Sequence, residues 1–241
     1  QVRSQELRAS EDPGEFYSAA MQKGDTYVLI GEQSLEDQKA SVAVSGDGGA
    51  TWEVHKTMAT GRLVSGYMFD EKNGLVVGEA GTALTTDDGG ASWEIRTTKV
   101  LTDLQGAFLL TPDKGWAVGA NSTIVTTSNG GRSWQVLQGG QPSGEVGEGE
   151  IMLMAVHFFD EKNGLVAGAG TEGAILKTKD GGKTLETVYQ NEDNFVDLVF
   201  SDPANGWAVG KYGLIVGTTD GGVTWEMLAS PTEEDLWDID V

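Results

Sequence analysis

The stretch "SGDGGATW", residues 45–52, sets an acidic residue and two adjacent glycines before a large aromatic residue. Four related stretches follow it. They are "TDDGGASW" at 86–93, "TSNGGRSW" at 127–134, "TKDGGKTL" at 178–185 and "TTDGGVTW" at 218–225. The last residues are Trp52, Trp93, Trp134, Leu185 and Trp225, so the spacings are 41, 41, 51 and 40. A motif that returns at a nearly fixed period of this size indicates a repeat architecture.

A second motif keeps step with the first and fixes the kind of repeat. It reads "TYVLIG" at 26–31, "GLVVG" at 74–78, "GWAVG" at 115–119, "GLVAG" at 164–168 and "GWAVG" at 206–210, and another apolar segment lies ahead of each copy. Each repeat therefore predicts four short strands joined by turn residues. Four strands in about 40 residues are typical of a propeller blade. We expect an all-β chain folded as a β-propeller of four-stranded antiparallel blades.

The repeats divide the chain into five blades within a single domain, residues 1–241. We expect the blades at about 15–57, 64–98, 102–138, 151–190 and 194–229. The segment 236–241, "LWDIDV", is expected to be the first strand of a further or closing blade, and 1–8 an outermost strand. Two interpretations of the ring stay open: it is small and closes through these segments, or the natural chain is longer.

The opening motif has the chemistry of a turn. An Asp or Asn at its centre accepts hydrogen bonds from nearby backbone amides, and the glycines that follow adopt positive φ without strain. The closing tryptophan buries a large ring that anchors the turn to its blade. A calcium loop needs more oxygen ligands than the motif supplies, so we expect structural turns and no metal. The turn residues are Asp47, Trp52, Asp88, Trp93, Asn129, Trp134, Asp180, Asp220 and Trp225, and Leu185 is expected to be a weaker anchor.

Composition excludes several classes of function. The net charge of −21, from 37 acidic and 16 basic residues, would repel the phosphates of a nucleic acid. The charge is explained either by solubility or by a basic partner surface. The absence of cysteine excludes thiolate metal sites and a cysteine nucleophile, and the presence of only two histidines, His55 and His157, disfavours a transition-metal site. We expect no cofactor, no nucleic-acid partner and no membrane span. The start at Gln1 indicates that a leader was removed, either by processing, which favours an exported chain, or by design of the expressed fragment.

The turn motif resembles the Asp-box, S/T-x-D-x-G-x-T/S-W, of sialidases, sortilin-type receptors and some xyloglucan-degrading enzymes. Together with "GWAVGKYGLIVGTTDGGVTW" at 206–225, it looks most like the photosystem II stability/assembly factor family and its bacterial relatives. That resemblance implies a parent fold of six or seven blades and a non-enzymatic assembly role on the lumenal side of a membrane, with an arginine-rich patch. This chain departs from the pattern, since its five arginines are scattered.

We therefore expect a non-enzymatic scaffold or assembly factor for a subunit of a membrane complex, located in a periplasm or thylakoid lumen. The alternative is a glycan-binding or glycan-cleaving propeller, which would need an aromatic channel mouth and two carboxylates about 5–10 Å apart. A sialidase is disfavoured because the chain lacks the Arg-Ile-Pro motif and a recognisable arginine triad.

The partner face is expected where loops join the second strand to the third and one blade to the next. An acidic insert at 139–150 belongs to these connections, either as a tolerated insertion or as a contact for a basic surface. The candidate contact residues are Arg62, Glu79, Asn121, Glu172, Lys211 and Tyr212.

Overall fold

The protein, studied as a computed structural model, is described over residues 17–33, 39–140 and 151–241. Its strands form five separate four-stranded antiparallel sheets, which confirms the expected all-β propeller architecture. Blade one holds β1 (Tyr17–Lys23), β2 (Thr26–Gln33), β3 (Ala40–Ser45) and β4 (Glu53–Lys56). Blade two holds β5 (Leu63–Met68), β6 (Gly74–Gly78), β7 (Thr82–Thr86) and β8 (Glu94–Thr97).

The other three blades repeat this order. Blade three holds β9 (Leu104–Leu109), β10 (Gly115–Gly119), β11 (Thr123–Thr127) and β12 (Gln135–Gln138). Blade four holds β13 (Met152–Phe158), β14 (Gly164–Ala169), β15 (Gly173–Thr178) and β16 (Glu186–Asn191). Blade five holds β17 (Phe195–Phe200), β18 (Gly206–Gly210), β19 (Ile215–Thr218) and β20 (Glu226–Met227).

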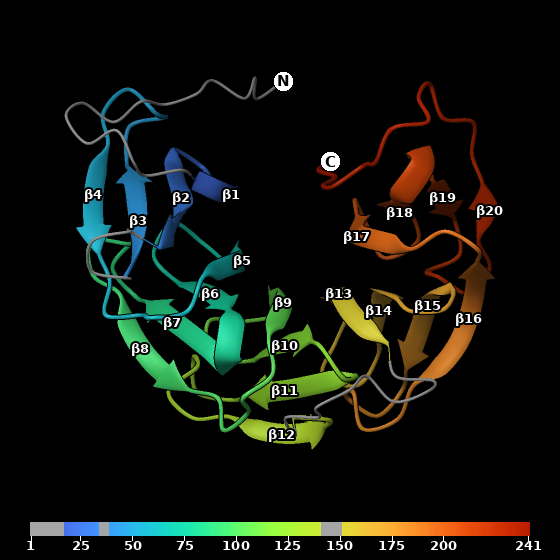
Figure 1. Cartoon of the computed structure of the whole chain (residues 1–241), viewed down its shortest axis with the longest axis horizontal. Coiled ribbons are helices and arrows are strands. Elements are labelled where there is room, and N and C mark those ends of the chain that lie inside the picture. Colours follow the sequence, from blue (N-terminus) through green and yellow to red (C-terminus); the bar gives the residue numbers. More distant parts are fainter. Residues whose placement is uncertain (1–16, 34–38, 141–150) are drawn as a thin grey trace.

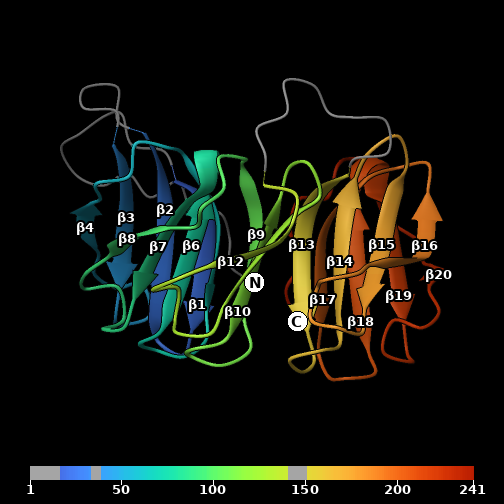
Figure 2. The same cartoon turned by 90° about the horizontal axis from the view of Figure 1, so that it is seen from below.

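The blades follow one another around an arc, with the first strand of each nearest the centre and the fourth at the outside (Figure 1). Among the described residues the arc stays open between blade one and blade five. Seen edge on, the strands run between the two ends of the molecule (Figure 2). Because the sheets are antiparallel, two kinds of connection share each end. The box end carries the turns between strands one and two and the Asp-boxes; the loop face carries the loops between strands two and three and the links between blades.

The core lies between neighbouring blades, since both faces of an inner sheet are covered. Strands β6 and β10 are accordingly buried at every position, whereas the outer strands are mostly exposed. Side chains of β10 alternate: Trp116 and Val118 pack toward blade four, and Ala117 packs toward blade two. This alternation explains why the second sequence motif is an unbroken apolar run.

The closing glycine of the second motif permits a close approach of two chain segments. A Cβ atom on Gly119 would overlap the carbonyl oxygen of Asp103, in the link that enters blade three. The same overlap occurs at Gly78 with Arg62 and at Gly210 with Asn194. Glycine is therefore required where the second strands of blades two, three and five pass under the incoming link.

Residues 236–241 form no strand with the described residues, and their place as the first strand of a further or closing blade stays a prediction. The Leu236 amide donates to the Gly210 carbonyl at 2.9 Å, the position in which a following blade would begin. A blade's first strand is normally completed by pairing with its own second strand, and the described chain supplies none here. The segment 1–8 and residues 141–150 of the insert lie outside the described residues.

Candidate functional site

The loop face brings two of the six candidate contact residues together. Arg62 ends the link into blade two, and Glu79 opens the short 3-10 turn η1 (Glu79–Gly81). The Arg62 Nε lies 3.4 Å from the Glu79 Oε1, and the Arg62 backbone N–H donates to the Glu79 Oε2 at 3.1 Å. The pair ties the link to the loop, so this arginine is already neutralised.

Lys211 and Tyr212 lie in the equivalent 3-10 turn of blade five, η2 (Lys211–Gly213). Asp235 holds both: its Oδ2 is 2.7 Å from the Lys211 Nζ, and its Oδ1 accepts the Tyr212 N–H at 3.1 Å. The Lys211 Nζ also lies 3.6 Å from the ring centroid of Trp237. The Tyr212 side chain projects into solvent, since the residue is 71% exposed.

The backbone at the tips of these loops is left-handed in three blades. Ala80, Asn121 and Tyr212 have φ values of 51°, 56° and 54°. Non-glycine residues avoid this region, and tyrosine is a poor choice for it. Strain of this kind concentrates at functional sites, which marks the loop tips as the first place to look for function. Glu172 lies exposed in the β14–β15 loop of blade four.

Sequence reasoning missed other residues of the loop face. Asp103 accepts the Ala80 N–H at 2.9 Å, just as Asp235 accepts that of Tyr212. Met58 and Leu101, in the links into blades two and three, are each 67% exposed. The Asp-Leu pair that recurs at 103–104 and 235–236 could have identified Asp103 and Asp235 from the sequence. No sequence pattern predicted the exposure of Met58 and Leu101.

The Asp-boxes form closed turns at the box end. The Asp47 Oδ1 accepts the Ser45 hydroxyl at 2.8 Å and the Thr51 N–H at 2.9 Å, and its Oδ2 accepts the Thr51 hydroxyl at 2.7 Å. These bonds, led by the Thr51 hydroxyl, lower the pKa of Asp47 to about 2. The same bonds form around Asp88, Asp180 and Asp220.

Blade three builds the same turn without a charge. The Asn129 Oδ1 accepts the Ser133 N–H, and its Nδ2 donates to the Ser133 hydroxyl, both at 2.9 Å. In every blade the first box glycine also donates its N–H to a carbonyl of the turn between strands one and two, as Gly130 does to Asp113 at 2.9 Å. This second tie is not visible in the sequence.

The closing side chains of the boxes lie against their blades. Trp134 and Trp225 are buried, Trp52 and Trp93 are half-buried, and Leu185 packs at the edge of the cluster between blades three and four. The Trp52 Nε1 donates to the Gly49 carbonyl at 3.1 Å. The box therefore combines a polar turn with an apolar anchor.

The histidines occupy apolar or outer positions. His55 lies half-buried in β4. His157 lies in β13 among the rings of Phe108, Phe159 and Phe200, with centroids 4.8, 5.1 and 5.0 Å away. Burial lowers the pKa of His157 to about 4, so it is neutral near pH 7. Within the described residues, no three His, Cys, Asp or Glu side chains are grouped as metal ligands would be.

The environment of Asp197 disfavours the charged form of its carboxyl group. It lies on β17 beneath the C-terminal segment, where its Oδ2 accepts the Ile239 N–H at 3.0 Å. Burial is the main cause that raises its pKa to about 7, and the neighbouring Asp238 carboxyl adds to the effect.

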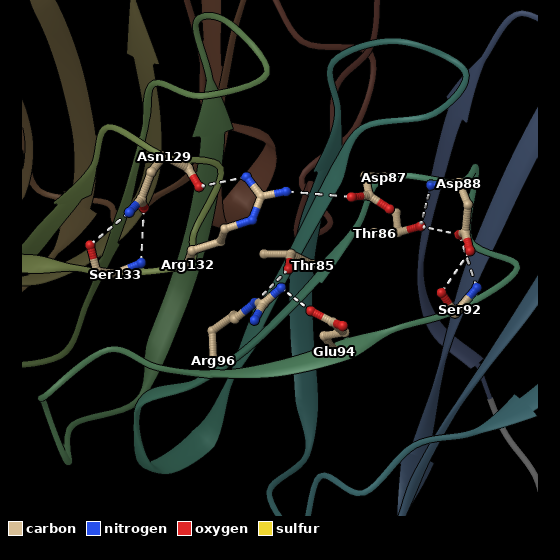
Figure 3. A network of polar contacts seen from close by, with 10 residues as sticks. All are labelled: Thr85, Thr86, Asp87, Asp88, Ser92, Glu94, Arg96, Asn129, Arg132 and Ser133. Atoms are coloured by element: carbon tan, nitrogen blue, oxygen red, sulfur yellow. Dashed lines mark hydrogen bonds and ion pairs between the residues drawn. The ribbon is translucent and has the colours of Figure 1, made fainter.

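A polar cleft of about 220 Å³ opens at the box end between blades two and three. Figure 3 shows its network: the Arg132 Nη2 lies 3.5 Å from Asp87 on the neighbouring box, and the Arg96 Nε donates to the Thr85 hydroxyl at 3.0 Å and pairs with Glu94. The cleft collects two of the chain's five arginines, although they are scattered in the sequence.

Comparisons with known proteins agree with this fold. A family model described as "Photosynthesis system II assembly factor YCF48" matches residues 64–139 and 95–191. The "Photosystem II assembly lipoprotein Ycf48" of Prochlorococcus marinus is 38% identical over 77 residues, 30% of this chain and 23% of that protein. The match thus spans under a quarter of the relative's length.

Solved structures extend the likeness to most of the chain. "YCF48 bound to D1 peptide" has a TM-score of 0.61 at 17% identity and covers 88% of this chain and 66% of that one. "YCF48 from Cyanidioschyzon merolae" has a TM-score of 0.62 at 16% identity, over 91% and 74%. A Niastella koreensis GH74 enzyme has a TM-score of 0.64 at 14% identity, over 88% and 38%. At these identities the likeness shows the fold.

No helix in the described part of the chain has the length and apolarity needed to cross a membrane. The family model covers residues 64–191, or 128 of 241, which is more than half of the chain. The resemblance inferred from the repeats is confirmed, and this chain belongs to the photosynthesis system II assembly factor YCF48 family.

Proposed function

We propose that this chain is a non-catalytic assembly or accessory factor that binds a basic surface on a subunit of a membrane complex through its loop face, outside the cytoplasm. Its family membership and its relatives support an assembly role: one relative is named an assembly lipoprotein, and one solved relative is bound to a D1 peptide. The lipoprotein relative supports the extracytoplasmic location.

The charge of the loop face is the observation that carries this proposal. Exposed carboxylates come from links and loops of several blades and outnumber the cations, of which Arg62 and Lys211 are paired with Glu79 and Asp235 and Lys99 is exposed in the link into blade three. A face of this kind attracts a basic partner and speeds encounter with it. The exposed acidic residues are Asp103, Glu172, Glu192, Glu233 and Glu234.

Apolar side chains stand among these charges and supply contacts that exclude water. Met58, Leu101 and Tyr212 are 67%, 67% and 71% exposed. Aromatic and methionine anchors within a polar rim are typical of protein interfaces. The cleft at the box end differs from the aromatic-lined site expected of a glycan-binding propeller, because none of its lining side chains is aromatic.

The test is affinity capture from native membranes with the tagged protein, followed by mass spectrometry and repeated across salt concentrations. We expect a membrane-complex subunit whose recovery falls with salt. The double variant Glu172→Lys and Glu192→Lys should no longer capture this subunit. The double variant Glu186→Lys and Glu226→Lys, the same total charge change on outer strands β16 and β20, is the matched control. If the loop-face double variant recovered the subunit as well as the wild type does, or if the purified protein hydrolysed glycans, the proposal would be overturned.

A further inference from the structure

Two junctions between blades contain a cross-link that is missing from the junction between blades two and three, where the cleft lies. Between blades three and four, the Trp116 Nε1 donates to the carbonyl of the first box glycine, Gly181, at 2.9 Å. Between blades four and five, the Lys177 Nζ donates to the equivalent carbonyl of Gly221 at 3.2 Å. In both cases a donor-tipped side chain from one blade fills the space against the next blade's box.

The corresponding positions in blade two carry side chains that cannot reach. Strand pairing places Leu75 where blade three has Trp116, and Thr85 where blade four has Lys177. Neither extends to the carbonyl of Gly130, the first box glycine of blade three, and no side chain in the described ranges donates to it. The shorter residues leave the cleft of about 220 Å³.

The charges around this space favour a cation. Three carboxylates, Asp87, Glu94 and Asp113, line the cleft with two guanidinium groups. Arg132 lies 3.5 Å from Asp87, and Arg96 is paired with Glu94, so each arginine is committed to a carboxylate. Within the described ranges no Lys or Arg lies within ion-pair distance of Asp113. The surplus charge is negative, and the chain's net charge of −21 adds to it.

We propose that the cleft between blades two and three is a second binding site, which accepts a lysine side chain of a partner segment, with its ammonium group at the Gly130 carbonyl and Asp113. The occupant repeats what Lys177 does within the chain at Gly221. The cleft is at the box end, away from the loop face, so this site is separate from the one that carries the proposed function.

The experiment titrates the whole chain with Nα-acetyl-lysine methylamide, whose side-chain ammonium group is free, and follows the backbone amide NMR signals of Gly130, Gly131 and Asp113. We expect these signals to move with the lysine probe and to stay still with N-acetyl-norleucine methylamide. The probe's affinity should fall roughly tenfold in Asp113→Asn, the size of one lost charge-assisted hydrogen bond.

A filled cleft supplies the decisive variant. Thr85→Lys places a lysine where blade four has Lys177, and should abolish probe binding; Thr97→Lys, the same change at an exposed position of β8, should leave it intact. If Thr85→Lys does not fold, Asp113→Asn keeps the test open. Signals that move with N-acetyl-glutamate methylamide and not with the lysine probe would make this an anion site and overturn the proposal. Signals that move with neither probe would overturn it as well.

Discussion

The Trp116 indole N–H donates to the Gly181 carbonyl at 2.9 Å and joins blades three and four across 65 residues of sequence. The ring is fully buried and lies flat on Phe158, with centroids 3.6 Å apart and planes 3° apart. One residue thus connects the second strand of a blade to the Asp-box of the next. Both the stacked ring and the hydrogen bond of Trp116 hold blade three against blade four.

Replacing Trp116 by leucine should lower the free energy of unfolding by about 2–4 kcal/mol, because the change leaves a cavity and removes the donor to Gly181. Urea denaturation followed by circular dichroism measures it. Trp207→Leu is the matched control, since Trp207 holds the equivalent place in blade five, is half-buried, and is covered by no following blade among the described residues. Equal losses in the two variants would contradict the junction's role.

The Asp-box carboxylate should be replaceable by an amide but not by a methyl group. Asp220→Ala removes the acceptor for Thr224 and Thr218 and should lower the thermal midpoint of unfolding. Asp220→Asn should lower it less, because Asn129 keeps the equivalent bonds in blade three. Differential scanning calorimetry compares the two variants. Similar losses would mean that charge, and not hydrogen bonding, holds the turn.

Asp197 should make the protein less stable as the pH rises. Its folded pKa of about 7 lies above the ordinary value of ~3.9, so the folded state holds a proton that the unfolded state has lost. The free energy of unfolding should therefore fall between about pH 4 and pH 7 and level off above. Asp47 has the opposite effect. Because its folded pKa of about 2 lies below the ordinary value, its contribution to the free energy of unfolding is lost as the pH falls below ~4.

Urea titrations at pH 5 and pH 8 test the Asp197 effect. The wild type should be more stable at pH 5, and Asp197→Asn should flatten the difference, since the amide has no proton to lose. Asp202→Asn, on a turn where hydrogen bonds lower the carboxyl pKa, should leave the difference in place. A slope that survives in Asp197→Asn would place its origin in another group.

Tyr212→Gly should stabilise the fold while weakening partner binding. Glycine relieves the left-handed backbone at φ 54°, a gain of about 1 kcal/mol. It also removes the exposed ring from the loop face. Ala80→Gly is the control, because it relieves the same strain at φ 51° without removing a large side chain. If Tyr212→Gly captured the partner as well as the wild type does, the tyrosine would have no part in binding.

The periodic features of the chain were predictable from the sequence. The boxes and the "GWAVG" motif indicated four strands in every repeat because turn chemistry and buried strands have local signatures. The turns at Asp47 and Asn129 have a local signature for the same reason: their hydrogen bonds run to residues two and four positions away.

Relationships between repeats were not predictable in the same way. The cleft exists because Leu75 and Thr85 are shorter than Trp116 and Lys177, a difference that matters only once the blades are packed. The rise in the Asp197 pKa depends on the C-terminal segment folding back over β17. Residues 236–241 have the pattern of a strand, but no strand among the described residues pairs with them, which a pattern alone does not reveal.

Hydrogen–deuterium exchange on the complex with its captured partner tests the central claim most directly. The account predicts slower exchange in the loop-face segments 57–62, 79–82, 98–103, 170–173 and 211–213, and unchanged exchange in the Asp-box turns of blades one, four and five. Slower exchange confined to those turns, with the loop face unchanged, would contradict it.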